Sequence, residues 1–276
     1  MSSVVLFNTD GAGLRFAGGR GWGRVVPVPA WFMIRLSRSR DPEALMGGWR
    51  SVARRAGLRL LTLGEAGGEP VFALSGGRGG REVYLSAGVH GDEPAAVWGL
   101  LEWASMHDWR GRGLRFLIFP CLNPWGLRRN VRLDFRGRDL NRRFQVLRDP
   151  LVGAWRRMVL GRVPSVALCL HEDYDAEGCY VYERSAGGRV FSRAALQAAG
   201  AFIPVDRRRL IEGRAARDGL VRRREDGSDV VGRPEALALW DFGCPLALTF
   251  ETPSEREFGL RVGAHSAFVG EALKAL

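Results

Sequence analysis

The chain of 276 residues lacks several features that mark secreted or membrane-spanning proteins. It has four cysteines, none in a CxxC pair, and Cys121, Cys169 and Cys244 sit in or beside apolar runs, where small buried thiols are common. No stretch reaches the roughly 18 uninterrupted apolar residues of a membrane span, and no clean signal peptide opens the chain. These absences predict a soluble protein of a reducing, cytoplasmic compartment, with no membrane partner.

Lysine is almost absent. Lys274 is the only one, so arginine supplies every other basic residue behind the net charge of +11. The arginines are spread along the chain rather than gathered in one arm, which indicates a codon preference as much as a phosphate-binding surface. We therefore expect no dedicated nucleic-acid partner, although a basic surface can steer an acidic substrate.

Alternating apolar runs and helical patterns predict an α/β protein with a mostly parallel sheet and helices on both faces. Residues 1–40, rich in Gly and Arg, are expected to form a loosely ordered or accessory N-terminal extension, and residues 41–276 to form the main domain. We expect arginine-rich loops at 125–143 and 206–232. Strands are expected over 58–63, 70–74, 83–87, 114–120, 165–170, 179–182 and 245–250, and helices over 41–56, 94–107, 151–160, 192–200, 235–241 and 255–276.

Four polar residues stand just past the C-terminal ends of predicted apolar strands: His90, Asn123, His171 and Glu251. In open α/β sheets, ligands bind outside the carboxyl ends of the strands. Although these residues are far apart in the sequence, the pattern predicts that they meet at one rim of the sheet.

Two histidines and a carboxylate at that rim, His90, Glu93 and His171, form the three-ligand set of a catalytic zinc, which leaves a fourth position open. HxxE alone is common and often binds no metal, and His171 alone could be a satisfied core histidine. Their shared rim favours the metal interpretation. The other two histidines, His107 and His265, look structural or solvated.

Glu251 ends an apolar strand, and a partly desolvated carboxylate there suits the general base of metal-assisted hydrolysis. The alternative is a capping role for the helix that follows. Most arginines of the 125–143 loop are expected to be solvated. Asn141 and Arg142 differ, because a guanidinium fork beside an amide donor can grip a carboxylate.

In this order, the residues resemble the M14 family of zinc carboxypeptidases. The resemblance runs from about residue 41 to the C-terminus, over what would be the catalytic domain. It implies a central mixed, mostly parallel eight-stranded sheet with helices on both faces. Its signature consists of Gly88-Val89-His90-Gly91-Asp92-Glu93, Asn123-Pro124-Trp125-Gly126, Arg132, Asp139-Leu140-Asn141-Arg142, His171 and Glu251.

The resemblance also implies a role for each site residue. One Zn²⁺ per chain would be held by the two histidines and Glu93, with Glu251 as general base. Arg132 would polarise the scissile carbonyl, and Asp139 would orient the His90 imidazole. Asn141 and Arg142 would bind the terminal carboxylate of the substrate.

The chain departs from the family pattern in two respects. The best-known members carry a mobile tyrosine before the final catalytic strand, but residues 206–250 contain none. The chain is also compact, and in this it is similar to the murein peptide amidases and to the related succinylglutamate desuccinylase/aspartoacylase branch. Arg132, nine residues before Asn141, fits the peptidase pattern better than the deacylase pattern. Residues 230–239 are expected to line the specificity pocket, where Glu235 would either favour a cationic group or face solvent.

The leading hypothesis is a metallocarboxypeptidase that hydrolyses an amide bond next to a free carboxylate in small peptides, with cell-wall-derived peptides as one candidate. The alternative is an N-acyl-amino-acid deacylase of the aspartoacylase or succinylglutamate desuccinylase type. A third reading is a non-catalytic binding protein on the same scaffold, but no expected metal ligand is missing. The sequence leaves the oligomeric state open.

Overall fold

The structure, a computed structural model, describes residues 5–7, 14–16, 38–109, 113–222 and 231–276. The chain divides into two compact units, residues 1–38 and 39–276. In the first unit, β1 (Val5–Phe7) pairs antiparallel with β2 (Leu14–Phe16). Most of the expected extension lies outside the described residues, so its accessory role stays a prediction.

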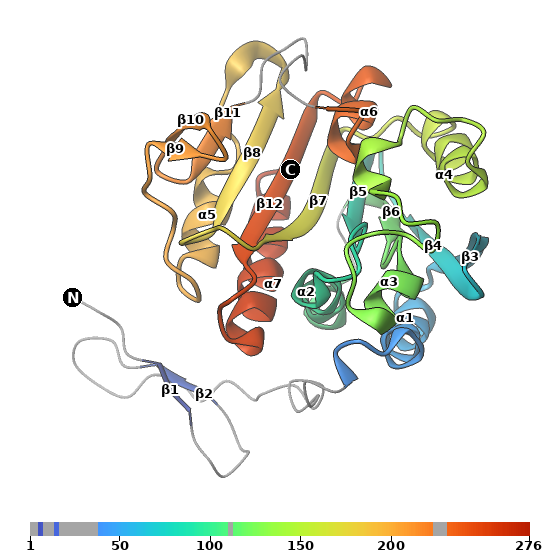
Figure 1. Cartoon of the computed structure of the whole chain (residues 1–276), viewed down its shortest axis with the longest axis horizontal. Coiled ribbons are helices and arrows are strands. Elements are labelled where there is room, and N and C mark those ends of the chain that lie inside the picture. Colours follow the sequence, from blue (N-terminus) through green and yellow to red (C-terminus); the bar gives the residue numbers. More distant parts are fainter. Residues whose placement is uncertain (1–4, 8–13, 17–37, 110–112, 223–230) are drawn as a thin grey trace. The chain divides into compact units, whose positions relative to one another are not determined.

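The second unit is built on a ten-stranded mixed sheet in the order β3-β4-β6-β5-β7-β12-β8-β11-β10-β9 (Figure 1). The four central strands β6, β5, β7 and β12 are parallel. The remaining pairs are antiparallel, except for β8 with β11. The strands are β3 (Arg59–Ala66), β4 (Glu69–Gly77), β5 (Arg81–Ala87), β6 (Leu114–Phe119), β7 (Val166–Asp173), β8 (Tyr180–Ser185), β9 (Leu210–Ile211), β10 (Arg214–Arg217), β11 (Leu220–Arg222) and β12 (Leu246–Pro253).

The mixed α/β class is confirmed, but the sheet has ten strands rather than eight. The strands β9, β10 and β11, which were not expected, fall in the arginine-rich stretch 206–232, which was expected to be a loop. They are two to four residues long, and β10 reads Arg-Ala-Ala-Arg. Strands of two to four residues are too short to show an alternating pattern, so periodicity could not reveal them.

Several helices, among them α1, begin at a residue whose side chain caps them. The Asp41 carboxylate accepts hydrogen bonds from the backbone N–H groups of Glu43 and Ala44, and α1 ends at Gly57 in the left-handed region. Within the expected 125–143 loop lie α3 and the 3₁₀ turn η3. The helical segments are α1 (Pro42–Ala56), α2 (Pro94–Met106), α3 (Pro124–Arg129), η3 (Leu140–Arg142), α4 (Pro150–Leu160), η4 (Ala186–Gly188), α5 (Arg193–Ala199), α6 (Glu235–Asp241) and α7 (Phe258–Lys274).

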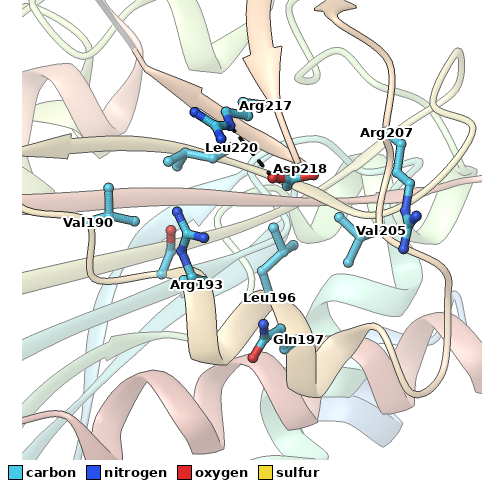
Figure 2. A pocket seen from close by; sticks show the side chains of 10 residues that line it. Val190, Arg193, Leu196, Gln197, Val205, Arg207, Arg217, Asp218 and Leu220 are labelled. Carbon is cyan, nitrogen blue, oxygen red and sulfur yellow. Dashed lines mark ion pairs between the residues drawn. The ribbon is translucent and has the colours of Figure 1, made fainter.

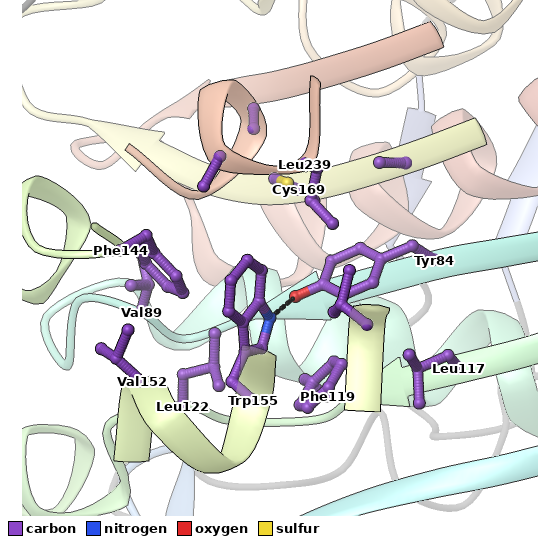
Figure 3. Packing of buried hydrophobic residues seen from close by; sticks show 14 of the residues in the cluster. Tyr84, Val89, Leu117, Phe119, Leu122, Phe144, Val152, Trp155, Cys169 and Leu239 are labelled. Carbon is purple, nitrogen blue, oxygen red and sulfur yellow. Dashed lines mark hydrogen bonds between the residues drawn. The ribbon is translucent and has the colours of Figure 1, made fainter. Parts of the chain in front are cut away.

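A hydrophobic cluster beneath α4 and α6 holds these helices to the central strands (Figure 3). Trp155 of α4 is fully buried, donates from Nε1 to the Tyr84 hydroxyl at 2.7 Å, and meets Phe144 edge to face. On the other side, α2 packs against α7, and α7 packs against α5. The strands that carry the candidate site are therefore fixed by packing.

The structure also bears on the expected lack of a membrane span and on the expected state of the cysteines. Within the described ranges, no helix has the length and apolarity needed to cross a membrane. All four cysteines are buried and none forms a disulfide, which agrees with Cys121, Cys169 and Cys244 being small buried residues.

Candidate functional site

His90 lies in the turn between β5 and α2, as expected from the sequence. This turn packs so closely on α3 that a Cβ on Gly91 would lie 2.0 Å from the carbonyl carbon of Gly126. Only glycine permits this approach, which gives the glycine of the His-Gly-Asp-Glu motif a structural reason. Glu93 then stands directly before Pro94, where α2 begins.

His171 and Glu251 lie on the adjacent parallel strands β7 and β12 and occupy paired positions. Both were expected just past a strand end, but the β7–β12 ladder continues two residues further, to Asp173 and Pro253. Directly paired residues project from the same face of a sheet, on strands about 4.8 Å apart. The sheet therefore brings the two side chains together near the carboxyl ends of the strands.

The three predicted metal ligands form a cluster. One carboxylate oxygen of Glu93 lies 2.5 Å from Nδ1 of His90, and the other lies 3.0 Å from Nδ1 of His171. One ligand atom from each residue lies within 4.8 Å of the other two, and all three side chains are buried. Two imidazoles and a carboxylate are donors that zinc accepts, and three protein ligands leave a position for a reactant. The donor set therefore fits a single Zn²⁺.

The pKa shifts within the cluster also fit a cation-binding site. Burial alone would lower the pKa of His90, but Glu93 and Asp139 together raise it to about 9. Burial would raise the pKa of Glu93, yet the two histidines lower it well below its ordinary value. The Glu93 carboxylate thus favours positive charge on both neighbouring imidazoles, in the place where a cation would sit.

Asp139 connects the cluster to Arg132. Its Oδ1 lies 3.1 Å from Nε2 of His90, and its Oδ2 accepts from Nη2 of Arg132 at 3.2 Å. Burial raises the pKa of Asp139, but the His90 contact and the nearby charges lower it well below the usual range. Nη1 of Arg132 also reaches within 3.7 Å of Glu93, while 42% of the arginine side chain stays exposed. Arg132 therefore stands where it can contact both the cluster and solvent.

Asn123, the fourth rim residue, holds the loop that carries Arg132. Its Oδ1 accepts from the backbone N–H of Gly126 at 3.0 Å and caps α3. Its Nδ2 donates to the carbonyl of Leu133 at 3.0 Å and to that of Arg132 at 3.4 Å. Asn123 is thus a positioning residue for the arginine.

Asn141 and Arg142 lie in η3, which Asp139 caps. The side-chain Oδ1 of Asn141 accepts from the backbone N–H of Glu235 at 2.9 Å, so the residue ties η3 to α6. The half-buried Arg142 donates from Nη1 to the backbone carbonyl of Asn141 at 3.1 Å, and in the described part of the chain no carboxylate pairs with it. By contrast, Arg138 is occupied by Asp134 and Asp149, each at 2.7 Å. The charge of Arg142 therefore remains open to an anion, as do those of Arg129, Arg136 and Arg143, which also have no carboxylate partner among the described residues.

Glu251 is half-buried, and none of the described residues forms a hydrogen bond or ion pair with its carboxylate. Burial raises its pKa well above the ordinary value, with a further contribution from Glu93. On its other side, β8 places Tyr180 opposite it in register. The Tyr180 hydroxyl donates to Oδ2 of Asp173 at 2.9 Å, so it is already engaged and does not supply the missing mobile tyrosine.

Two buried glutamates differ from what the sequence suggested. Glu235 neither faces solvent nor lines an open pocket, since it is 1% exposed and accepts hydrogen bonds from the hydroxyls of Tyr84 and Ser86. Glu172, which the sequence did not single out, accepts from the backbone N–H of Ala95 at 2.6 Å and pairs with Arg261. It anchors the start of α2 beside Glu93. Nothing in the sequence separates either glutamate from a surface carboxylate.

Comparison with known proteins supports the fold. The fold is zinc carboxypeptidase-like. A candidate metallopeptidase from Shewanella denitrificans OS217 is 24% identical, with a TM-score of 0.76 over 85% of this chain and 90% of that one. One from Shewanella baltica OS155 is 25% identical, with a TM-score of 0.75 over 86% and 92%. A metallo-carboxypeptidase from Burkholderia cenocepacia is 22% identical, with a TM-score of 0.61 over 84% and 68%.

At the level of sequence families, a model of the succinylglutamate desuccinylase/aspartoacylase catalytic domain matches residues 79–150. That segment contains His90, Glu93, Arg132, Asn141 and Arg142, but it ends before β7. No curated protein matches the chain. The resemblance predicted from the sequence is thus confirmed as a likeness of fold and of this segment.

Proposed function

We propose that the protein is a zinc-dependent hydrolase that cleaves an amide bond next to a free carboxylate. The observation that carries this proposal is the buried cluster of His90, Glu93 and His171, with the unpaired carboxylate of Glu251 on the neighbouring strand. The metallopeptidase-like and carboxypeptidase-like neighbours support a hydrolase of this kind.

The residues divide the chemistry between them. Bound zinc would act as a Lewis acid that polarises the carbonyl and lowers the pKa of water. Glu251 takes the proton from the attacking water and passes it to the leaving nitrogen as the C–N bond breaks and the new C–O bond forms. Its raised pKa suits the first step, because a stronger base holds more firmly the proton it removes. Arg132 stabilises the negative charge that develops on the carbonyl oxygen.

Binding of the substrate falls to η3. Arg142 has no carboxylate partner among the described residues, so its guanidinium fork can receive the terminal carboxylate of a substrate. Asn141 is held against α6 through its side-chain oxygen Oδ1, which leaves the side-chain N–H₂ as its donor group. An anchor tied to α6 in this way is preorganised, so little conformational entropy is lost on binding.

Peptides are the proposed substrate class, because the spacing of Arg132 and Asn141 follows the peptidase pattern. The second candidate is an N-acyl amino acid, which the match of residues 79–150 to the desuccinylase/aspartoacylase model favours. Purified protein loaded with zinc should be tested on a dipeptide library and on N-acetyl- and N-succinyl-amino acids. Turnover of the acylated amino acids alone would replace the first assignment by the second.

A further inference from the structure

A cavity of about 230 Å³ lies between α5 and the strands β10 and β11 (Figure 2). We call it the α5 pocket. It shares no lining residue with the metal cluster or with η3. No histidine, cysteine or glutamate lines it, so it offers neither a metal site nor a strong nucleophile. Its chemistry must therefore be that of binding.

The charged residues of the α5 pocket are Arg193, Arg207, Arg217 and Asp218. Figure 2 shows Arg193 and Arg207 on either side of Leu196, with Arg217 and Asp218 above Leu196. Arg217 has Asp218 at 3.9 Å, and both side chains are largely exposed, whereas neither Arg193 nor Arg207 has an acidic partner in the described ranges. Three arginines and one aspartate line the pocket, so its lining carries a net charge of about +2 and is complementary to an anion.

The remaining wall is apolar. It includes Leu196 of α5, Val205 and Leu220 of β11. A Cβ on Gly219, whose φ is +72°, would lie 2.5 Å from Cγ1 of Val205 and 2.9 Å from Cδ2 of Leu196. Glycine at this position lets those side chains close against the backbone, so the wall is tightly packed and its shape is fixed.

The start of α5 is anchored as well. The Ser192 hydroxyl and backbone N–H both donate to Oε2 of the buried Glu183, at 2.5 and 3.0 Å. Arg193 follows directly and is exposed. The helix that carries one of the two unpaired guanidinium groups therefore has a defined position relative to β8.

We propose that the α5 pocket binds a small organic acid, a carboxylate on a short aliphatic chain. Guanidinium forks match carboxylate geometry, and the leucine and valine wall receives the chain. The cavity is smaller than the roughly 300–1,000 Å³ of drug-sized sites, so a nucleotide or a peptide segment does not fit inside it. An inorganic anion would leave the apolar wall uncovered.

Titration calorimetry with hexanoate and acetate tests the proposal on the full chain. Hexanoate should bind at least tenfold more tightly than acetate. The double variant Arg193→Gln/Arg207→Gln should bind hexanoate at least tenfold more weakly than the unsubstituted protein. The matched control Arg54→Gln/Arg59→Gln, which removes two exposed arginines of α1 and β3, should change binding less than twofold.

A carboxylate could also bind at Arg142, so the Arg142→Ala variant is titrated in parallel and should retain hexanoate binding. Equal affinities for hexanoate and acetate would show general attraction to a basic surface and overturn the proposal. Unchanged binding in the Arg193→Gln/Arg207→Gln protein would overturn it as well. So would loss of hexanoate binding in the Arg142→Ala protein, which would place that ligand at η3.

Discussion

His171 and Glu251 are paired across the adjacent parallel strands β7 and β12. The pairing joins a predicted metal ligand to a predicted base through the ladder of the sheet itself. Neither side chain depends on a loop for its position, and both strands are buried in the centre of the sheet. Sites built on rigid elements hold their geometry more tightly than sites on loops. The relative position of the two side chains is therefore fixed by the sheet, so a substitution at either one can be interpreted by the loss of that side chain.

Replacement of His171 by alanine should remove the metal. The substitution leaves Glu93 with one imidazole instead of two, so the cluster has too few ligands for tight zinc binding. Zinc per chain, measured by atomic emission after dialysis, should fall from about one to near zero. The control is His107→Gln, because that ring packs among Trp103, Trp109 and Phe116, outside the metal cluster. Retention of stoichiometric zinc in the alanine protein would count against the ligand assignment.

The substitution Asp139→Asn should weaken zinc binding without abolishing it. The carboxylate contacts Nε2 of His90 and lowers the cost of a positive charge on that ring. Loss of such a supporting partner typically costs about 10- to 100-fold in metal affinity. Competition with a chromogenic chelator measures the change. The isosteric side chain can still accept the backbone N–H of Asn141, so an unfolded variant is not expected, and unchanged affinity would remove Asp139 from the site.

Arg142→Ala should raise KM for substrates with a free C-terminal carboxylate and leave amidated substrates nearly unchanged. A lost charge-assisted hydrogen bond corresponds to about 1.5–3 kcal/mol, or roughly 10- to 150-fold in affinity. Steady-state kinetics on matched free and amidated peptides measure the difference. Arg148→Ala, at an exposed position after the same loop, serves as control. Equal losses on both peptides would contradict an anchoring role.

Glu102 predicts a pH dependence of stability that is separate from the site. It lies buried in α2, and burial raises its pKa from 4.5 to about 8. The unfolded chain therefore loses this proton at a lower pH than the folded chain. Stability should be fully present below about pH 4.5 and fall as the pH rises to about 8, by about 1.4 kcal/mol per unit of pKa difference. Urea unfolding at pH 5 and pH 8 should show a smaller loss for Glu102→Gln than for the wild type.

The sequence predicted the elements with strong periodicity and the residues tied to strand ends. α1, α2, α4 and α6, and the apolar strands β5, β6, β7 and β12, agree with the expectations within a few residues. Those strands brought His171 and Glu251 together, because the carboxyl ends of parallel strands share one edge. The short strands of residues 210–222 were missed, because two to four residues are too few to show an alternating pattern.

The interpretation of Glu235 failed for a different reason. Its partners Tyr84 and Ser86 are about 150 positions away in the chain, and a buried glutamate has the same local sequence as an exposed one. Arg138 is likewise occupied by two carboxylates, whereas Arg142 has none among the described residues. Composition ranks these arginines alike, and only tertiary contacts distinguish them.

The most direct test of the account is the turnover of Glu251→Gln measured on a preparation whose zinc content is known. About one zinc per chain is expected in both proteins, because Glu251 is outside the cluster of three ligands. The kcat of the variant should fall at least about 10²-fold, the scale that a general acid–base residue contributes. Full turnover of Glu251→Gln with zinc bound would contradict the assignment of the base and, with it, the proposed hydrolysis at this rim of the sheet.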